Sequence, residues 1–449
     1  MMHDICDSPV SLSCQSQLDD WNGVVHGVLS HGTKPGIHLG ALLDTNPDFA
    51  MGHAARGLFM IMTGRKEMLT LAVASAKISK QTLKDHGGNA REQGWVTALD
   101  QWLNDHPTGA IETMEKILRE NPRDTISAKL SHAIRFILGD GNGMRRSVER
   151  VLGAHGSDHA MRGYILGCHA FTLEETGEYA AAERTGLQGL QYATDDAWGL
   201  HAVAHVYDMT ANPDAGIKLI EDNVAAWGHC NNFTYHVWWH KALLHLDRGE
   251  LDVALALYDT KIRQDKTDDY RDIANATSLL MRLELEGMDV ANRWAELADF
   301  SENRTEDSCL VFADLHYMLA LAGANRPDAK AEMTARFARD AVHSGDMATR
   351  IKNPGLAAMA GLNAFSEGRY NDAFVNLAAA RPSMQTIGGS HAQRDVFERM
   401  TIDAGLRAGR VDQVETFLSE RLAQRAGHED RFTATRFASL ADARRIPAQ

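Results

Sequence analysis

Cysteine is scarce in this sequence and follows no recognisable pattern. Five cysteines occur in 449 residues, widely scattered and never as C-x-x-C. This excludes a disulfide framework and a cysteine-based structural zinc site, and it is typical of reduced thiols. The N-terminal segment lacks the basic and apolar regions of a secretory signal, so we expect no such signal. Together these features predict a cytoplasmic protein.

Clustered positive charge and long apolar runs are lacking as well. The sequence has 46 lysines and arginines against 60 aspartates and glutamates, for a net charge of −14. Because binding to nucleic acid or to an anionic membrane requires clustered basic side chains, we expect neither as a partner. The longest apolar runs, such as 57–62, are too short to span a bilayer.

Several signatures of enzyme families are absent. The chain contains no P-loop, no G-x-G-x-x-G, no G-x-S-x-G and no H-E-x-x-H. We therefore expect no nucleotide cofactor and no serine-hydrolase chemistry. Alternating apolar and polar runs, which would predict strands, are also missing. The content of 44% hydrophobic and 24% charged residues is typical of a protein with a well-formed core.

Turn signals, in contrast, recur at intervals of about 34 to 43 residues, each between segments with helical apolar spacing. They are Gly64-Arg65, Asp105-His106-Pro107, Gly139-Asp140, Gly177-Glu178, Asn212-Pro213, Gly249-Glu250, Gly287, Asn325-Arg326, Gly368-Arg369 and Gly409-Arg410. One helical hairpin cannot bury its apolar face alone, so successive hairpins must stack. We predict an all-α, tetratricopeptide-like α-α superhelix over residues 21–440, with 1–20 as an N-terminal arm or cap. About ten hairpins would curl around a central groove or cavity.

Two pairs of histidines lie on neighbouring predicted helices. His201 and His205 form one His-x-x-x-His pair, and His236 and His240 form the other. Residues four apart project from one side of a helix, so two packed helices could bring four imidazoles together. Four such groups could bind zinc, iron or manganese. Without a metal, they could act as acids and bases near neutral pH.

Other polar residues fall on the predicted first helices, which line the concave groove of such repeats. We take His169, His316, Glu174 and Asp208 as candidate catalytic residues, the carboxylates also serving to orient histidines. Trp239 is a candidate substrate-binding residue, although core packing is the alternative for this tryptophan. His53 and His132 also fall on predicted first helices. For such single histidines, a hydrogen-bonding role in packing is the alternative to a role in the groove.

The segment after Gly388-Gly389 predicts a capped helix with a polar first turn. Ser390 and Gln393 have the spacing of a capping box. The first turn would carry three candidate substrate-binding residues, His391, Arg394 and Asp395, beside free backbone N–H groups suited to an anion. The alternative is an ordinary well-capped helix.

Several segments resemble the tetratricopeptide repeat protein 38 family, also described as StaR-like. They are "MGHAARGLFMIMTG", "LEETGEYAAAE", "HAVAHVYDM", "HVWWHKALLHLDRGELDVALALYD", "DLHYMLALA" and "GGSHAQRDVF". The resemblance extends from about residue 40 to residue 420 and implies a helical-repeat fold, but no particular activity. Some bacterial members of the family lie in biosynthetic gene clusters. The matched motif positions are His201, His205, His236, His240, His316, His391, Gln393, Arg394 and Asp395.

These observations favour a metal-dependent or acid–base enzyme acting on a small polar or anionic molecule in the groove. The alternative is a scaffold that binds a peptide or protein partner without catalysis. Grooves that clamp a peptide carboxylate use Lys, Arg and Asn, whereas this chain places His, Trp and acids there. Metal storage or sensing is a third hypothesis, and a homodimer is left open.

Overall fold

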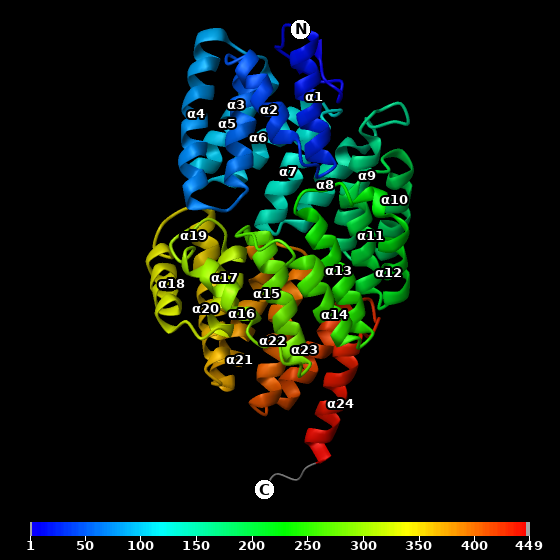
Figure 1. Ribbon diagram of the computed structural model, residues 1–449, viewed down its shortest axis with the longest axis vertical. Helices are drawn as coiled ribbons and strands as arrows, with labels where there is room; N and C mark the ends of the chain where they lie inside the picture. Colours follow the sequence, from blue (N-terminus) through cyan, green and yellow to red (C-terminus); the bar gives the residue numbers. More distant parts are fainter. Residues whose placement is uncertain (1, 446–449) are drawn as a thin grey trace.

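The computed structural model describes residues 2–445 and is built almost entirely from α-helices (Figure 1). A short antiparallel pair, β1 (Met2–His3) and β2 (Pro9–Val10), precedes them. The helices of the first half are α1 (Gln15–Leu29), α2 (Pro35–Thr45), α3 (Ala50–Ile61), α4 (Lys66–His86), α5 (Ala90–Leu103), α6 (Pro107–Glu120), α7 (Thr125–Leu138), α8 (Gly141–Leu152), α9 (Arg162–Glu175), α10 (Tyr179–Tyr192), α11 (Ala197–Met209), α12 (Pro213–Asp222) and the 3₁₀ turn η1 (Val224–Ala226).

The second half continues the same pattern. Its elements are α13 (Phe233–Asp247), α14 (Leu251–Leu257), η2 (Tyr258–Ile262), α15 (Tyr270–Leu285), α16 (Arg293–Glu302), α17 (Val311–Gly323), α18 (Pro327–Asp340), α19 (Asp346–Arg350), η3 (Ile351–Gly355), α20 (Leu356–Ser366), α21 (Tyr370–Ala380), η4 (Arg381–Ile387), α22 (His391–Arg407), α23 (Val411–Gln424) and α24 (Arg431–Arg445). The prediction of an all-α protein of tetratricopeptide-like helical hairpins is confirmed.

All ten predicted turns lie between two antiparallel helices. Each contains or adjoins one residue with positive φ, a conformation that ends an α-helix and that glycine adopts without steric cost. These residues are Gly64, Asp105, Gly139, Gly177, Ala211, Gly249, Gly287, Asn325, Gly368 and Gly409. The regular turn signals therefore mark ten helical hairpins.

The N-terminal region differs from the prediction in its boundary. Residue 20 lies inside α1, and α1 and α2 form an additional hairpin that no turn signal had indicated. The strand pair before α1 is a cap held by a buried carboxylate, Asp4, which accepts hydrogen bonds from Trp21 Nε1 at 3.0 Å and from Arg91 Nη1 at 2.8 Å. Arg91 also pairs with Asp124, so one buried guanidinium joins the cap to α5 and α7.

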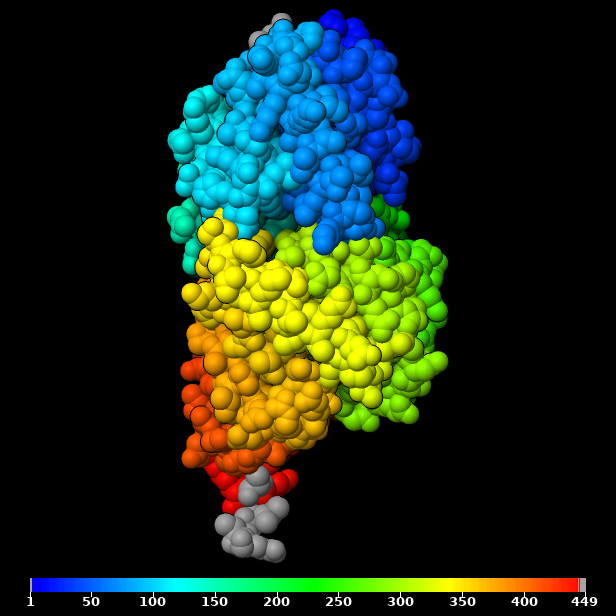
Figure 2. Space-filling model, turned by 90° about the vertical axis from the view of Figure 1, so that its left-hand side faces the viewer, coloured from blue at the N-terminus to red at the C-terminus, as the bar shows by residue number. Residues whose placement is uncertain are grey.

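The superhelix curls until segments far apart in sequence meet. In Figure 2 the blue and cyan N-terminal part of the chain lies directly against the yellow segment. One contact between these parts is a hydrogen bond that Thr108 Oγ1 donates to Asp346 Oδ2 at 2.7 Å. Arg304 bonds to Glu67 at 2.8 Å, and Asn231 N donates to the carbonyl oxygen of His31 at 2.8 Å. The contacts join residues 200 or more positions apart, so the superhelix folds back on itself and its two halves are in direct contact.

The innermost helices are buried on every side. Residues 196–206 around α11 and residues 310–321 around α17 are all buried. A helix that is apolar all round belongs in the interior of a protein. Among residues 2–445, however, no helix combines the length and the apolarity needed to cross a membrane. Polar side chains on these inner helices are therefore carried into the core.

Candidate metal centre

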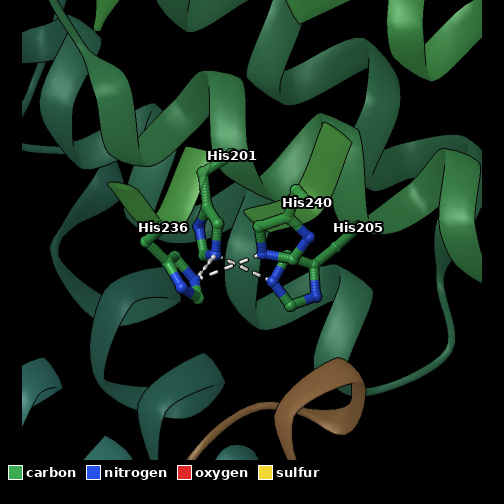
Figure 3. Close-up of side chains that lie close together, drawn as sticks. All are labelled: His201, His205, His236 and His240. Atoms are coloured by element: carbon green, nitrogen blue, oxygen red, sulfur yellow. Dashed lines mark hydrogen bonds between the residues drawn. The ribbon is translucent and has the colours of Figure 1, made fainter. Parts of the chain in front are cut away.

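Four histidines converge in the interior, two from α11 and two from α13 (Figure 3). The Nε2 atom of His205 lies 2.8 Å from that of His201, and His236 Nε2 lies 3.1 Å from His201 Nε2 and 3.2 Å from His240 Nε2. We call these four residues the histidine tetrad. The juxtaposition expected from the i, i+4 spacing on neighbouring first helices is therefore present.

The tetrad is buried and its imidazoles are neutral. The exposed fractions are 2% for His201, 0% for His205, 9% for His236 and 1% for His240. Burial lowers the pKa of His236 to about 4 and that of the other three well below the ordinary value, and the neighbouring imidazoles lower those three further. Neutral imidazole is the form that binds metal ions.

Polar groups outside the tetrad lie behind two of its rings, one of them at hydrogen-bond distance. His236 Nδ1 donates to Asn275 Oδ1 at 2.9 Å, so its Nε2 carries a lone pair toward the centre. His205 Nδ1 lies 3.7 Å from Glu174 Oε2, which places a carboxyl group behind this ring. Carboxylate or amide groups behind ligand histidines are typical of metal sites.

The spacing of the four nitrogens fits a transition-metal ion. Ligand distances of about 2.0–2.1 Å in a tetrahedron place nitrogens roughly 3.3–3.4 Å apart. The tetrad distances of 2.8 to 3.2 Å are slightly shorter, and all four ligand atoms lie within 4.8 Å of one another. Small ring movements would accommodate an ion, and its charge would offset the repulsion between converging lone pairs.

A second polar group adjoins the tetrad through His205. Glu174 is fully buried, and neither of its oxygens has a hydrogen-bond partner within the described structure. Burial, with the nearby charge of Glu175, raises the pKa of Glu174 to about 7. Burial lowers the pKa of His391, but Glu175 and Glu174 outweigh this effect and raise it overall. Glu174, Glu175 and His205 form a second set with metal-ligand spacing.

The first turn of α22 differs from the prediction in one respect. The capping box of Ser390 and Gln393 is confirmed. The backbone N–H of His391, however, donates to Glu175 Oε1 at 2.7 Å, and Arg394 Nη2 lies 3.3 Å from Glu175 Oε2. The helix N-terminus thus binds a carboxylate of this same chain, because the superhelix brings α9 against α22. It is not free for an external anion.

Two other predicted residues, His169 and His316, make their contacts away from the tetrad, and a third, Trp239, packs against it. His169 Nε2 faces Glu149 at 3.6 Å. His316 Nδ1 donates to the carbonyl oxygen of Phe312 at 2.7 Å, so it packs within α17. Trp239 has no exposed surface and stacks on His236, with ring centroids 5.2 Å apart. The hypothesis that Trp239 contacts a substrate is corrected: this side chain supports a tetrad ring from within the core.

Two cavities flank this region. The first, of about 530 Å³, has mainly apolar walls that include His201 and His236, and we call it the apolar cavity. The second, of about 300 Å³, is the polar cavity, and four predicted residues line it: Asp208, His391, Arg394 and Asp395. Asp395 is held by Arg399 at 2.6 Å and Arg421 at 3.0 Å. Three of the four predicted substrate-binding residues, His391, Arg394 and Asp395, therefore share a cavity, but not the one that borders the tetrad.

Sequence reasoning did not find three residues near the tetrad. Asn275 orients His236 from α15, and Lys129 and His31 line the apolar cavity. None of the three belongs to a paired motif, and each comes from a different hairpin. No local signal in the sequence distinguishes them from other polar residues on amphipathic helices.

No protein-family model matches the chain. Among solved structures, it is similar to yeast Tom70, with 11% identity over 96% of this chain and 88% of that chain and a TM-score of 0.38. It is also similar to the human IFIT1 dimer with m7Gppp-AAAA, with 13% identity over 98% and 97% of the two chains and a TM-score of 0.36. A third similarity is to Naa15/Naa10 bound to HypK-THB, with 11% identity over 96% and 67% and a TM-score of 0.25. We therefore infer the function from the chain's own residues.

Proposed function

We propose that this helical-repeat protein holds a transition-metal ion in the histidine tetrad and uses it in a reaction on a small molecule. The observation that carries the proposal is the convergence of four buried, neutral imidazole nitrogens from α11 and α13. An all-imidazole ligand set suits zinc or iron better than manganese, which prefers oxygen ligands. The residues that resemble the tetratricopeptide repeat protein 38 family include all four ligands, which supports membership as part of the same proposal.

The surrounding residues provide groups for chemistry next to such an ion. A bound metal would supply Lewis-acid or water-activating chemistry. Glu174, with a pKa of about 7 and a position behind His205, is suited to accept or release a proton near neutral pH. His201 and His236 form part of the wall of the apolar cavity, where a substrate would lie beside the tetrad. A cytoplasmic location stays a prediction.

The number of protein ligands favours one alternative, a structural or sensing metal without turnover. Structural zinc sites usually have four protein ligands, whereas catalytic sites keep an open position. The two functions differ in whether the ion can take an additional ligand. Cobalt(II) substituted into the tetrad should change its visible spectrum on addition of azide if the site is catalytic, and it should not change if the site is closed.

Metal analysis of protein purified without an affinity tag tests the proposal. We expect stoichiometric zinc or iron, lost in a His205→Ala/His240→Ala double variant. The matched control is His245→Ala, because His245 lies on the same helix but bonds through Nδ1 to Glu250 Oε2 at 2.6 Å. If the protein neither contains nor takes up a transition metal, or if the double variant retains it, the proposal is wrong.

A further inference from the structure

The apolar cavity has the size and lining of a small-molecule site. Its volume of about 530 Å³ lies within the usual range for ligand pockets. Its walls come from several hairpins and carry many aromatic side chains, including Phe59, Phe136, Trp198, Phe233 and Phe312. Such walls would remove a largely apolar molecule from water.

One wall of this cavity carries a lysine that has neither a hydrogen-bond nor a salt-bridge partner among residues 2–445. Lys129 is only 8% exposed, and within residues 2–445 its Nζ atom has no hydrogen-bond or ion-pair partner. The atom lies 4.1 Å from the centre of the Trp198 ring, which also lines the cavity. The buried Asp196 acts on Lys129 electrostatically, but the two side chains form no salt bridge. A buried ammonium group that no anion contacts directly is unfavourable. The position therefore favours an anionic group that arrives with a ligand.

Other polar atoms of the cavity wall are also unsatisfied. His31 Nε2, both ring nitrogens of His132, Trp198 Nε1 and Asn275 Nδ2 are buried without hydrogen-bond partners among the described residues. Leaving a buried polar group unpaired is destabilising, because the group has lost its hydrogen bonds to water. Several such groups around one apolar cavity are the arrangement expected of a site whose polar contacts are made to a ligand.

We propose that the apolar cavity binds a small molecule with an aromatic or aliphatic body and one anionic group, such as a carboxylate. The anion would lie at Lys129 and the body against the aromatic wall around Trp198. The inference rests on the proposed function in so far as this ligand is the substrate of the metal centre. His201 and His236 of the tetrad form part of the wall of this cavity. The proposed ligand replaces the small polar molecule expected from the sequence. Binding itself requires no metal.

Three probes separate the two parts of this ligand. Isothermal titration calorimetry of the full-length protein would compare 2-naphthoate with its neutral analogue 2-naphthylmethanol and with acetate. We expect saturable binding of 2-naphthoate that is at least tenfold tighter than that of either other probe. Equal binding of 2-naphthoate and 2-naphthylmethanol, or no saturable binding of 2-naphthoate, would overturn the proposal.

Two variants locate the binding. Lys129→Met should weaken 2-naphthoate by about tenfold to a hundredfold, as expected for the loss of a hydrogen bond to a charged group, and should leave 2-naphthylmethanol unchanged. The matched control is Lys241→Met, which removes a lysine 5.3 Å from another tryptophan ring, Trp238, away from the cavity lining. Ala133→Phe fills the cavity without removing any polar group and should abolish binding of both naphthyl probes. Unchanged 2-naphthoate binding in both Lys129→Met and Ala133→Phe would refute the site.

The same titration separates this inference from the proposed metal centre. It is repeated on chelator-treated protein and on the His205→Ala/His240→Ala variant. Selective 2-naphthoate binding without any metal supports the ligand class even if the tetrad proves metal-free. Stoichiometric metal in a protein that does not bind 2-naphthoate overturns the ligand class alone.

Discussion

Loss of two tetrad histidines should remove the stabilisation that a bound metal gives to the fold. An ion that binds only the native state stabilises it by RT ln(1 + [L]/Kd), which is about 4.1 kcal/mol at a free concentration of 1,000 Kd. Unfolding entropy of about 2.1 cal/mol/K per residue gives roughly 0.9 kcal/mol/K for a chain of this length. The melting temperature of chelator-treated protein should therefore rise by about 4 °C when zinc is restored.

The measurement is a thermal melt followed by circular dichroism, with and without added zinc. The His205→Ala/His240→Ala variant should show no rise, because only two of four ligands remain. His245→Ala should respond like the unaltered protein, since its ring faces Glu250 rather than the tetrad. A zinc-dependent rise of equal size in the double variant, or none in the unaltered protein, would refute the assignment of the tetrad as a metal site.

Three further predictions concern groups around the tetrad and in the fold. Asn275→Leu should lower metal affinity by about 10- to 100-fold, measured by competition with a chelator, because His236 loses the bond that orients it. Burial lowers the pKa of His316 to about 4, so the unfolded chain binds a proton before the folded protein as pH falls from about 6.5 to 4. Stability is lost across that window at about 1.4 kcal/mol per pH unit for this group, and urea titrations of His316→Phe should show a correspondingly shallower loss. Gly139→Ala should cost about 3 kcal/mol or more in urea unfolding, since φ is +70° and the added Cβ would lie 1.7 Å from the Gln385 carbonyl oxygen. Gly177→Ala, at φ +83° with no neighbour within 4 Å, should cost only about 1 kcal/mol, and equal losses would contradict the steric argument.

Local features of the structure could be predicted from sequence because neighbouring residues decide them. The ten turn signals mark hairpin turns, and Ser390 with Gln393 caps α22 as expected. The two histidine pairs project from single helices at the predicted positions, since spacing of four residues sets that geometry regardless of the rest of the chain.

The curvature of the superhelix decided the features that could not be predicted from sequence. Each hairpin is rotated only slightly against the next, so the final meeting points depend on the sum of many small packing angles. Only the curvature of the superhelix sets α9 against α22. As a result Glu175 accepts a hydrogen bond at the N-terminus of α22, where the sequence had predicted an anion-binding site. The sequence by itself determined the hairpins and the faces on which their histidines lie. The tertiary structure decided which imidazoles meet and that Trp239 is buried behind them, because these features depend on contacts between distant hairpins. For the same reason only the tertiary structure shows that Lys129 faces a cavity with no hydrogen-bond or salt-bridge partner in the described part of the chain.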